Sequence, residues 1–149
     1  MSDKFFIDSN ILVYAHDTEN PEKQKQAQTV IFDGIRLENA VISTQVLSEF
    51  YVTITQKIKK PLPVLKAKEE LKYLSILEIV EIDITMILQA IHLQGKWNTS
   101  YWDGLILAAA EQAKCKTLIS EDFTDQQIYG HILIKNPFKF FSFGNDNPQ

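Results

Sequence analysis

The chain has 149 residues, of which 45% are apolar, 11% aromatic and 23% charged, with only five Gly and five Pro. This is the composition of an ordinary globular protein, and it excludes a disordered, collagenous or low-complexity chain. Fifteen Lys and Arg against 19 Asp and Glu give a net charge of −4, so metal ions or local patches would have to attract any polyanion.

Short apolar runs alternate with amphipathic segments in the first half of the chain. The run Lys4–Asp8 predicts a buried strand that ends in a carboxylate. Ser9 and Asn10 then supply helix-starting side chains for Ile11–Tyr14. The elements expected next are a helix over Pro21–Leu37, a strand over Ala40–Ser43, a helix over Val46–Ile58 and a helix over Pro63–Leu77.

The same alternation continues in the second half. A strand over Ile79–Ile82 precedes a helix over Thr85–Gln94, which Gly95 is expected to end. Asn98, Thr99 and Ser100 precede a further helix, and its inner apolar stripe is expected to contain Trp102, Leu105, Ile106, Ala109, Ala110 and Ala113. Strands over Thr117–Ile119 and Ile132–Ile134 complete the series. Strands separated by helices predict an α/β fold, with a central parallel sheet of four to five strands and helices on both faces.

The cysteine content and the hydropathy pattern bear on where the protein works. The single cysteine, Cys115, cannot form an internal disulfide and suits a reducing compartment. No apolar run approaches the roughly 18–20 residues of a membrane span, and Met1–Ile7 lacks the apolar stretch of a secretory signal. We therefore expect a cytoplasmic protein with no membrane segment.

Acidic residues fall where an open α/β sheet binds its ligands, beyond the carboxyl ends of the strands. Asp8 closes the first strand, Asp122 lies just past the fourth, and Asp103 opens the helix that leads into the fourth. Glu49 lies one turn into the helix after the second strand, on the flank of its apolar stripe. Carboxylates brought together repel one another unless a cation neutralises them, and an all-oxygen set of ligands suits Mg²⁺ or Mn²⁺.

Each acid also has a purely structural explanation. Asp8 suits a cap of the following helix, and Ser100 to Asp103 fits the capping-box pattern. Glu49 taken alone suits a solvated helix face, and Asp122 taken alone suits a turn. The spacing is therefore suggestive of a metal site but does not decide between the two explanations.

A group of basic residues follows the middle helix. Lys57, Lys59 and Lys60, with Lys96 and Trp97 later in the chain, are suited to contact phosphates or to stack on a base. The same residues equally suit solvated helix ends, so the sequence leaves both interpretations open.

Four segments carry a characteristic pattern in a fixed order. They are FIDSNILVY at Phe6–Tyr14, VLSEFY at Val46–Tyr51, SYWDGLI at Ser100–Ile106 and LISEDF at Leu118–Phe123, followed by NPF at Asn136–Phe138. Together they cover nearly the whole chain, and they resemble the PIN-domain family of metal-dependent ribonucleases, in particular toxins of the VapC type.

The resemblance implies a Rossmann-like α/β/α sandwich. The length of the chain predicts one domain, here a PIN domain over residues 1–143, and the sequence after it predicts a flexible tail over residues 144–149. It implies Mg²⁺ or Mn²⁺ as cofactor and hydrolysis of phosphodiester bonds in single-stranded RNA or exposed RNA loops. Toxin members of the family are typically homodimers that a cognate antitoxin holds inactive. The resemblance thus implies an RNA substrate, an antitoxin partner and a homodimer.

The family pattern also implies the site residues. The catalytic and metal-binding positions correspond to Asp8, Glu49, Asp103 and Asp122. Asn10 and Ser120 correspond to supporting polar positions, and Asp125 is the reserve for the fourth acid. Gly104 departs from the family, which usually has Ala there, and is expected to weaken its helix by up to about 1 kcal/mol.

Other classes of protein fit the sequence less well. A phosphotransferase with an aspartyl nucleophile needs a second acid two residues after the first, where this chain has Asn10. The chain has no G-x-x-x-x-G-K-[ST] motif and no G-x-G-x-x-G after the first strand, which argues against P-loop and dinucleotide-binding proteins. The alternative that remains is a non-catalytic PIN-like scaffold that binds RNA or protein. Four retained acids argue against it, because a cluster of carboxylates without a task only destabilises the fold.

Overall fold

The strands of the computed structural model, which describes residues 3–139, form one sheet in the order β3-β2-β1-β4-β6-β5. They are β1 (Phe5–Ile7), β2 (Ala40–Ser43), β3 (Glu78–Val80), β4 (Thr117–Ile119), β5 (Ile128–Tyr129) and β6 (Ile132–Lys135). Neighbouring strands are parallel, except that β5 pairs antiparallel with β6. The α/β class and the parallel sheet are confirmed, but the sheet has six strands where four to five were expected. The additional strand, β5, has two residues, too few to carry an alternating pattern.

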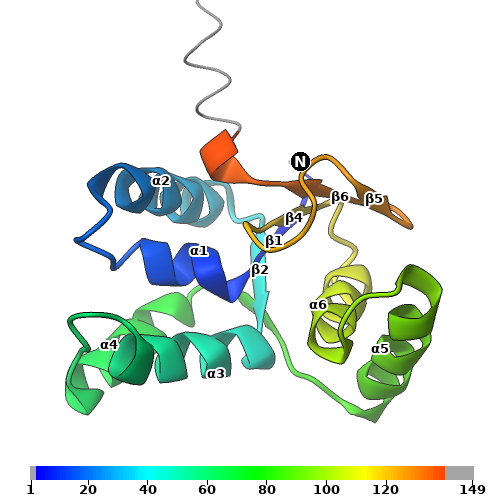
Figure 1. Cartoon of the computed structure of the whole chain (residues 1–149), viewed down its shortest axis with the longest axis horizontal. Coiled ribbons are helices and arrows are strands. Elements are labelled where there is room, and N and C mark those ends of the chain that lie inside the picture. The colour runs from blue at the N-terminus through cyan, green and yellow to red at the C-terminus, as the bar shows by residue number, and fades with distance from the viewer. Residues whose placement is uncertain (1–2, 140–149) are drawn as a thin grey trace, which may run out of the picture.

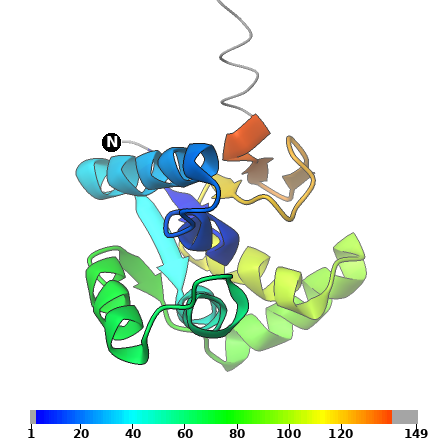
Figure 2. The same cartoon turned by 60° about the vertical axis from the view of Figure 1, so that its left-hand side comes forward.

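Helices cover both faces of the sheet (Figure 1, Figure 2). They are α1 (Ser9–Tyr14), α2 (Pro21–Leu37), α3 (Thr44–Val52), the π-helical turn η1 (Thr53–Lys57), α4 (Val64–Leu74), α5 (Ile84–Trp97) and α6 (Tyr101–Gln112). The chain proceeds from β1 outward through β2 to β3 and then returns to add β4 on the other side of β1. Because crossovers between parallel strands are right-handed, this reversal places α5 and α6 on the face opposite to α1–α4.

Apolar side chains of the central strands form the middle of the core. Six of these side chains expose no surface at all: Phe6, Ile7, Val41, Ile42, Leu118 and Ile134. Strands that are covered on both faces need such continuous apolar runs, which is why they were recognisable in the sequence. The core thus fixes the positions at which the strands end.

Two helix boundaries differ from those expected. The helix predicted over Val46–Ile58 is α3 followed by the π-helical turn Thr53–Lys57. Helix α5 does not end at Gly95, as predicted, but continues to Trp97 and ends where Asn98 adopts a left-handed conformation with φ 54°. Asparagine accepts this conformation more readily than most residues, and it therefore replaces glycine as the end of this helix.

Helices α5 and α6 approach each other closely at Gly104. A Cβ atom at this position would lie 2.6 Å from the carbonyl oxygen of Ala90 in α5. The expected weakening of α6 by Gly104 is therefore only part of its role, because the missing side chain permits the contact between the helices. This contact lies next to Asp103 and thus fixes the first turn of α6.

Two further expectations concern the C-terminal tail and the absence of a membrane segment. The predicted tail over residues 144–149 lies outside the described residues, as does the end of the predicted domain at 143. Within residues 3–139, no helix has both the length and the apolar character needed to span a membrane. Cys115 is free and buried.

Candidate metal centre

The strand order reverses at β1 and β4, so the carboxyl ends of these neighbouring strands border the crevice in which α/β sheets bind ligands. Asp8 follows β1 directly and is 5% exposed, whereas Ser120 follows β4 and is fully buried. Asp122 lies two residues beyond Ser120. Glu49 and Asp103 reach the same edge from α3 and from the first turn of α6.

Hydrogen bonds from separate elements hold the Asp8 carboxylate. The backbone N–H of Ser9 donates to Oδ1 over 2.7 Å, which makes Asp8 the cap of α1. Ser120 Oγ donates to Oδ2 over 2.7 Å, and Asn10 Nδ2 donates to the same oxygen over 3.3 Å. Asp8 therefore caps α1 through Oδ1, while its other carboxylate oxygen, Oδ2, faces the end of β4.

Asn10 and Ser120 also fix the segment after β4. Asn10 Nδ2 donates to Asp122 Oδ2 over 3.0 Å, while Asn10 Oδ1 accepts from the backbone N–H of Glu121 over 3.2 Å. Ser120 Oγ accepts from the backbone N–H of Asp122 over 3.1 Å. These two polar residues thus set the position of Asp122 relative to Asp8.

The other two acids after β4 are occupied elsewhere. Glu121 forms an ion pair with Lys23 of α2 at 2.5 Å. Asp125 Oδ1 accepts from the backbone N–H of Asn136 over 2.8 Å, so this carboxylate connects the loop to the chain beyond β6. Among these three acids, Asp122 is the one whose carboxylate contacts Asn10, and it lines the pocket at the sheet edge.

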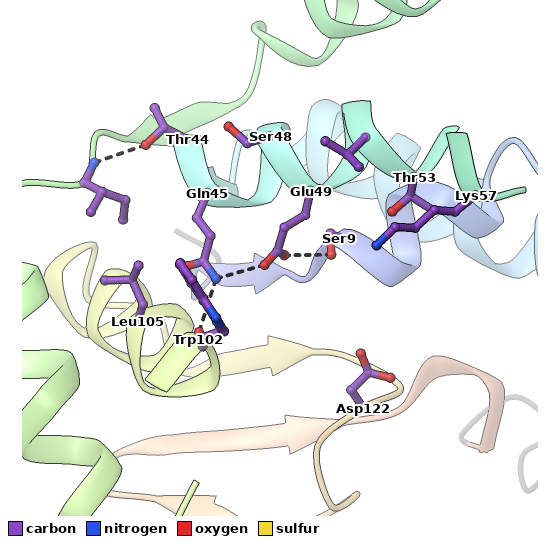
Figure 3. Close-up of a pocket in the computed structure, with 12 residues that line it drawn as sticks. Ser9, Thr44, Gln45, Ser48, Glu49, Thr53, Lys57, Trp102, Leu105 and Asp122 are labelled. Atoms are coloured by element: carbon purple, nitrogen blue, oxygen red, sulfur yellow. Dashed lines mark hydrogen bonds between the residues drawn. The ribbon is translucent and has the colours of Figure 1, made fainter. Parts of the chain in front are cut away.

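Glu49 connects three helices at the site (Figure 3). Ser9 Oγ donates to Glu49 Oε1 over 3.0 Å, and Gln45 Nε2 donates to Glu49 Oε2 over 3.1 Å. Gln45 Nε2 also donates to the carbonyl oxygen of Trp102 over 3.2 Å. The carboxylate is thereby positioned by the starts of α1, α3 and α6.

The acids act on one another electrostatically. Burial raises the pKa of Asp8 to about 7, the hydrogen bonds from Ser120 and Ser9 oppose the rise, and the charges of Asp122 and Glu49 add to it. The pKa of Asp103 is also raised, mainly by burial and then by the charge of Asp122. Ser100 Oγ accepts from the backbone N–H of Asp103 over 3.0 Å, so Ser100 caps α6 as the capping-box pattern predicted.

The donor set suits a hard divalent cation, although the carboxylates do not form a finished coordination shell. Within residues 3–139, no group of three or more His, Cys, Asp or Glu side chains is close enough together to hold a metal ion. Hydrogen bonds to Ser9, Asn10 and Gln45 keep the carboxylates at the border of the opening. All the donors are oxygens, and a bound cation would offset the burial and the mutual repulsion that raise the pKa values of Asp8 and Asp103.

A pocket of about 740 Å³ opens beside the acids, with Ser9, Glu49 and Asp122 in its wall (Figure 3). Trp102 also lines it and is 60% exposed, so its expected place in the inner stripe of α6 was wrong. The residue lies in the first turn of the helix, and this turn borders the pocket. Lys57 lines the same pocket from the end of η1.

Sequence reasoning did not single out Ser9 or Gln45 as site residues. Gln45 precedes Glu49 by four residues, a spacing that places two side chains on the same face of a helix. The spacing alone could therefore have identified Gln45 as a residue of the site. For Ser9, which follows Asp8 directly, only the folded structure shows the contact with a residue 40 positions later.

The chain is similar to known proteins in sequence pattern and in fold. The family model described as the PIN domain matches residues 5–128. A toxin–antitoxin complex from Klebsiella pneumoniae is 18% identical, with a TM-score of 0.65 over 90% of this chain and 98% of that chain. DNA-bound VapBC from Salmonella typhimurium is 15% identical, with a TM-score of 0.66 over 91% and 99%.

Another similar structure is VapC20 from Mycobacterium tuberculosis, described as a toxin that cleaves the sarcin–ricin loop. It is 10% identical, with a TM-score of 0.62 over 80% of this chain and 90% of that chain. No curated protein matches the chain in sequence. At such identities the likeness to the solved structures shows a shared fold.

Proposed function

The chain belongs to the PIN-domain family, and on this premise we propose that it is a ribonuclease that depends on Mg²⁺ or Mn²⁺ and hydrolyses phosphodiester bonds of RNA. We further propose that it is the toxin of a toxin–antitoxin pair and works in the cytoplasm. The observation that supports the nuclease most strongly is the group of interacting carboxylates at the crevice between β1 and β4.

Within residues 3–139, no cationic side chain pairs with these carboxylates. Among the ion pairs of the described residues, none involves Asp8, Glu49, Asp103 or Asp122. A buried acid with a pKa near 7 beside two further charges destabilises a fold, so its presence at the ligand-binding edge is best explained by a bound cation.

In this proposal Asp8, Glu49 and Asp103 would hold the ion once it draws their carboxylates together, because they do not form a finished shell without it. Asp122 would either complete the shell through water or support a second ion. When bound, Mg²⁺ or Mn²⁺ polarises a phosphoryl oxygen, makes water a stronger nucleophile and offsets the charge of the carboxylates.

The remaining polar residues position these acids. Asn10 and Ser120 hold Asp8 and Asp122 at a fixed separation, and Ser9 and Gln45 hold the two oxygens of Glu49. The low exposure of Asp8 keeps water from competing for that carboxylate. The chain's contribution to catalysis would thus be to fix negative charge along the crevice between β1 and β4, where an ion can bind.

The partners are proposed from the fold relatives. Several similar structures are toxin–antitoxin complexes, which supports an antitoxin partner for this chain. That the antitoxin holds the chain inactive, and that the toxin is a homodimer, are further parts of the proposal. A short neighbouring reading frame that encodes a DNA-binding protein would support this assignment, whereas a solitary gene would favour a role in RNA processing.

The decisive experiment is cleavage of RNA by the purified chain in Mn²⁺, with and without EDTA. We expect cleavage in Mn²⁺ only, and its loss in Asp8→Asn and Asp103→Asn. Asp33→Asn serves as the matched control, because this exposed acid on α2 pairs with Arg36, away from the crevice. If RNA binds without metal and is never cut, the chain is a PIN-like scaffold; if Asp103→Asn cuts as fast as wild type, the assignment of the acids is wrong.

A further inference from the structure

The pocket continues well beyond the acids. Its wall runs from Trp102 and Gln45 at one end to Thr53 and Lys57 at the other, and Glu49 and Ser9 lie between them (Figure 3). Lys57 and Trp102 thus lie on either side of Glu49. The volume of about 740 Å³ exceeds what a hydrated cation needs and lies within the range of sites that bind small organic ligands.

The π-helical turn brings Lys57 into this wall. In η1 the backbone N–H of Ile58 donates to the carbonyl oxygen of Thr53 over 3.2 Å, a bond that spans five residues instead of four. One additional residue in the turn rotates the following side chains by about 100° around the helix axis. Lys57 thereby lies on the pocket side of the segment, and in Figure 3 its amine points back toward Ser9 and Glu49.

The ammonium group of Lys57 remains available to a ligand. It lines the same pocket as Glu49 and Asp122, yet the ion pairs found in residues 3–139 do not include it. By contrast, nearby Lys60 pairs with Glu19 at 3.6 Å. Lys57 therefore presents an uncompensated positive charge beside a negative centre, a combination that suits a phosphodiester lying across both.

Trp102 provides a flat apolar surface at the other end of the pocket. Trp102 is 60% exposed, and its ring packs edge-on against Tyr101, with 5.0 Å between the ring centroids. The hydrogen bond from Gln45 to the Trp102 carbonyl oxygen fixes the backbone of this turn against α3. A large exposed indole held in this way is suited to stack on a nucleobase.

We propose that Lys57 and Trp102 form a nucleotide-binding subsite beside the acids, in which Lys57 binds a backbone phosphate and Trp102 stacks on an adjacent base. A base can reach the indole only when it is unstacked from its own strand. The subsite therefore selects RNA that is single-stranded at the point of cleavage. This inference rests on the proposed function and adds the residues that position the substrate.

Binding of a short fluorescein-labelled single-stranded RNA, followed by anisotropy, tests the subsite. The full chain carries Asp103→Asn in this experiment, so that the probe is not cut. We expect Lys57→Gln to weaken binding about tenfold and to reduce the slope of log affinity against log salt by about one, as loss of one phosphate contact requires. Lys59→Gln, an exposed lysine that is not part of the pocket wall, is the matched control and should bind as the parent does.

Trp102 should show a different pattern. Trp102→Ala is expected to weaken binding about tenfold without changing the salt slope, and Trp102→Phe should restore most of the affinity because it keeps an aromatic face. An RNA duplex of the same sequence should bind Trp102→Ala and its parent equally. Thermal melting of each variant separates loss of the subsite from loss of the fold.

The outcomes distinguish this inference from the proposed function. If the otherwise wild-type chain cuts RNA while Lys57→Gln and Trp102→Ala bind and cut it unchanged, the subsite is refuted and the nuclease stands. If binding depends on both residues but the wild-type chain never cuts RNA, the subsite stands and the nuclease is refuted.

Discussion

Replacing Asp8 with Asn should change how the stability of the metal-free protein depends on pH. The pKa of Asp8 is raised from 3.8 to about 7 in the folded chain, mainly because the carboxyl is buried. Between these values the folded state binds a proton that the unfolded state has lost. The free energy of unfolding therefore falls as the pH rises from about 4 to about 7, and above this range the fold contains a buried anion beside Asp122 and Glu49.

The expected size of this effect follows from the two pKa values. Because the pKa rises from 3.8 to about 7, the free energy of unfolding falls by about 4 kcal/mol between pH 4 and pH 8. Asparagine at position 8 keeps an acceptor for the backbone N–H of Ser9, but its amide nitrogen would face Asn10 Nδ2, another donor, at a cost of about 1 kcal/mol. At pH 8 without metal, we expect Asp8→Asn to be at least as stable as wild type and more stable by up to about 3 kcal/mol.

Urea unfolding in EDTA at several pH values between 5 and 8 measures the effect. The difference in unfolding free energy between Asp8→Asn and wild type should grow steadily in favour of the variant as the pH rises. Asp33→Asn, the exposed control, should follow wild type throughout. If the unfolding free energies of Asp8→Asn and wild type change with pH in parallel, Asp8 is not a buried acid with a raised pKa.

Three further predictions concern other parts of the molecule. Burial and the neighbouring charge of Glu78 raise the pKa of Cys115 to about 12, so iodoacetamide at pH 8 should modify this thiol only after unfolding; rapid modification of the native protein would contradict its burial. Gly104→Ala should lower the free energy of unfolding by about 1–3 kcal/mol, because the new Cβ atom has no room. Gly95→Ala should raise the free energy of unfolding by about 0.5–1 kcal/mol, because nothing lies within 4 Å of its new Cβ atom. Equal effects in the two variants would contradict the close contact between the helices. Asp125→Asn should cost about 1 kcal/mol of stability and keep metal-dependent cleavage, since its carboxylate holds a backbone N–H; loss of cleavage in this variant would make Asp125 the fourth acid.

The strands and the acids at their ends could be predicted because both depend on local sequence. A buried parallel strand needs a continuous apolar run, and the residue after it falls at the carboxyl edge of the sheet, as Asp8 does after β1. The capping role of Ser100 was likewise predictable from a pattern of four residues. Each of these features involves neighbours in the chain.

Features that depend on contacts between distant segments could not be predicted. The π-helical turn that directs Lys57 into the pocket could not be recognised in the sequence, because the apolar pattern of residues 46–58 is also that of one continuous α-helix. Trp102 fits the apolar stripe of α6 by its spacing, and only the position of the first turn at the pocket exposes its ring. The close contact that requires Gly104 depends on a carbonyl oxygen in another helix.

Calorimetric titration of the chain with Mn²⁺ tests the claim that the acids beside the ends of β1 and β4 bind a hard divalent cation. We predict saturable binding to wild type and to Asp33→Asn, and binding at least about tenfold weaker in Asp8→Asn and in Asp103→Asn, as loss of a ligand requires. A wild-type chain that binds no Mn²⁺, or variants that bind it as tightly as wild type does, would contradict the claim.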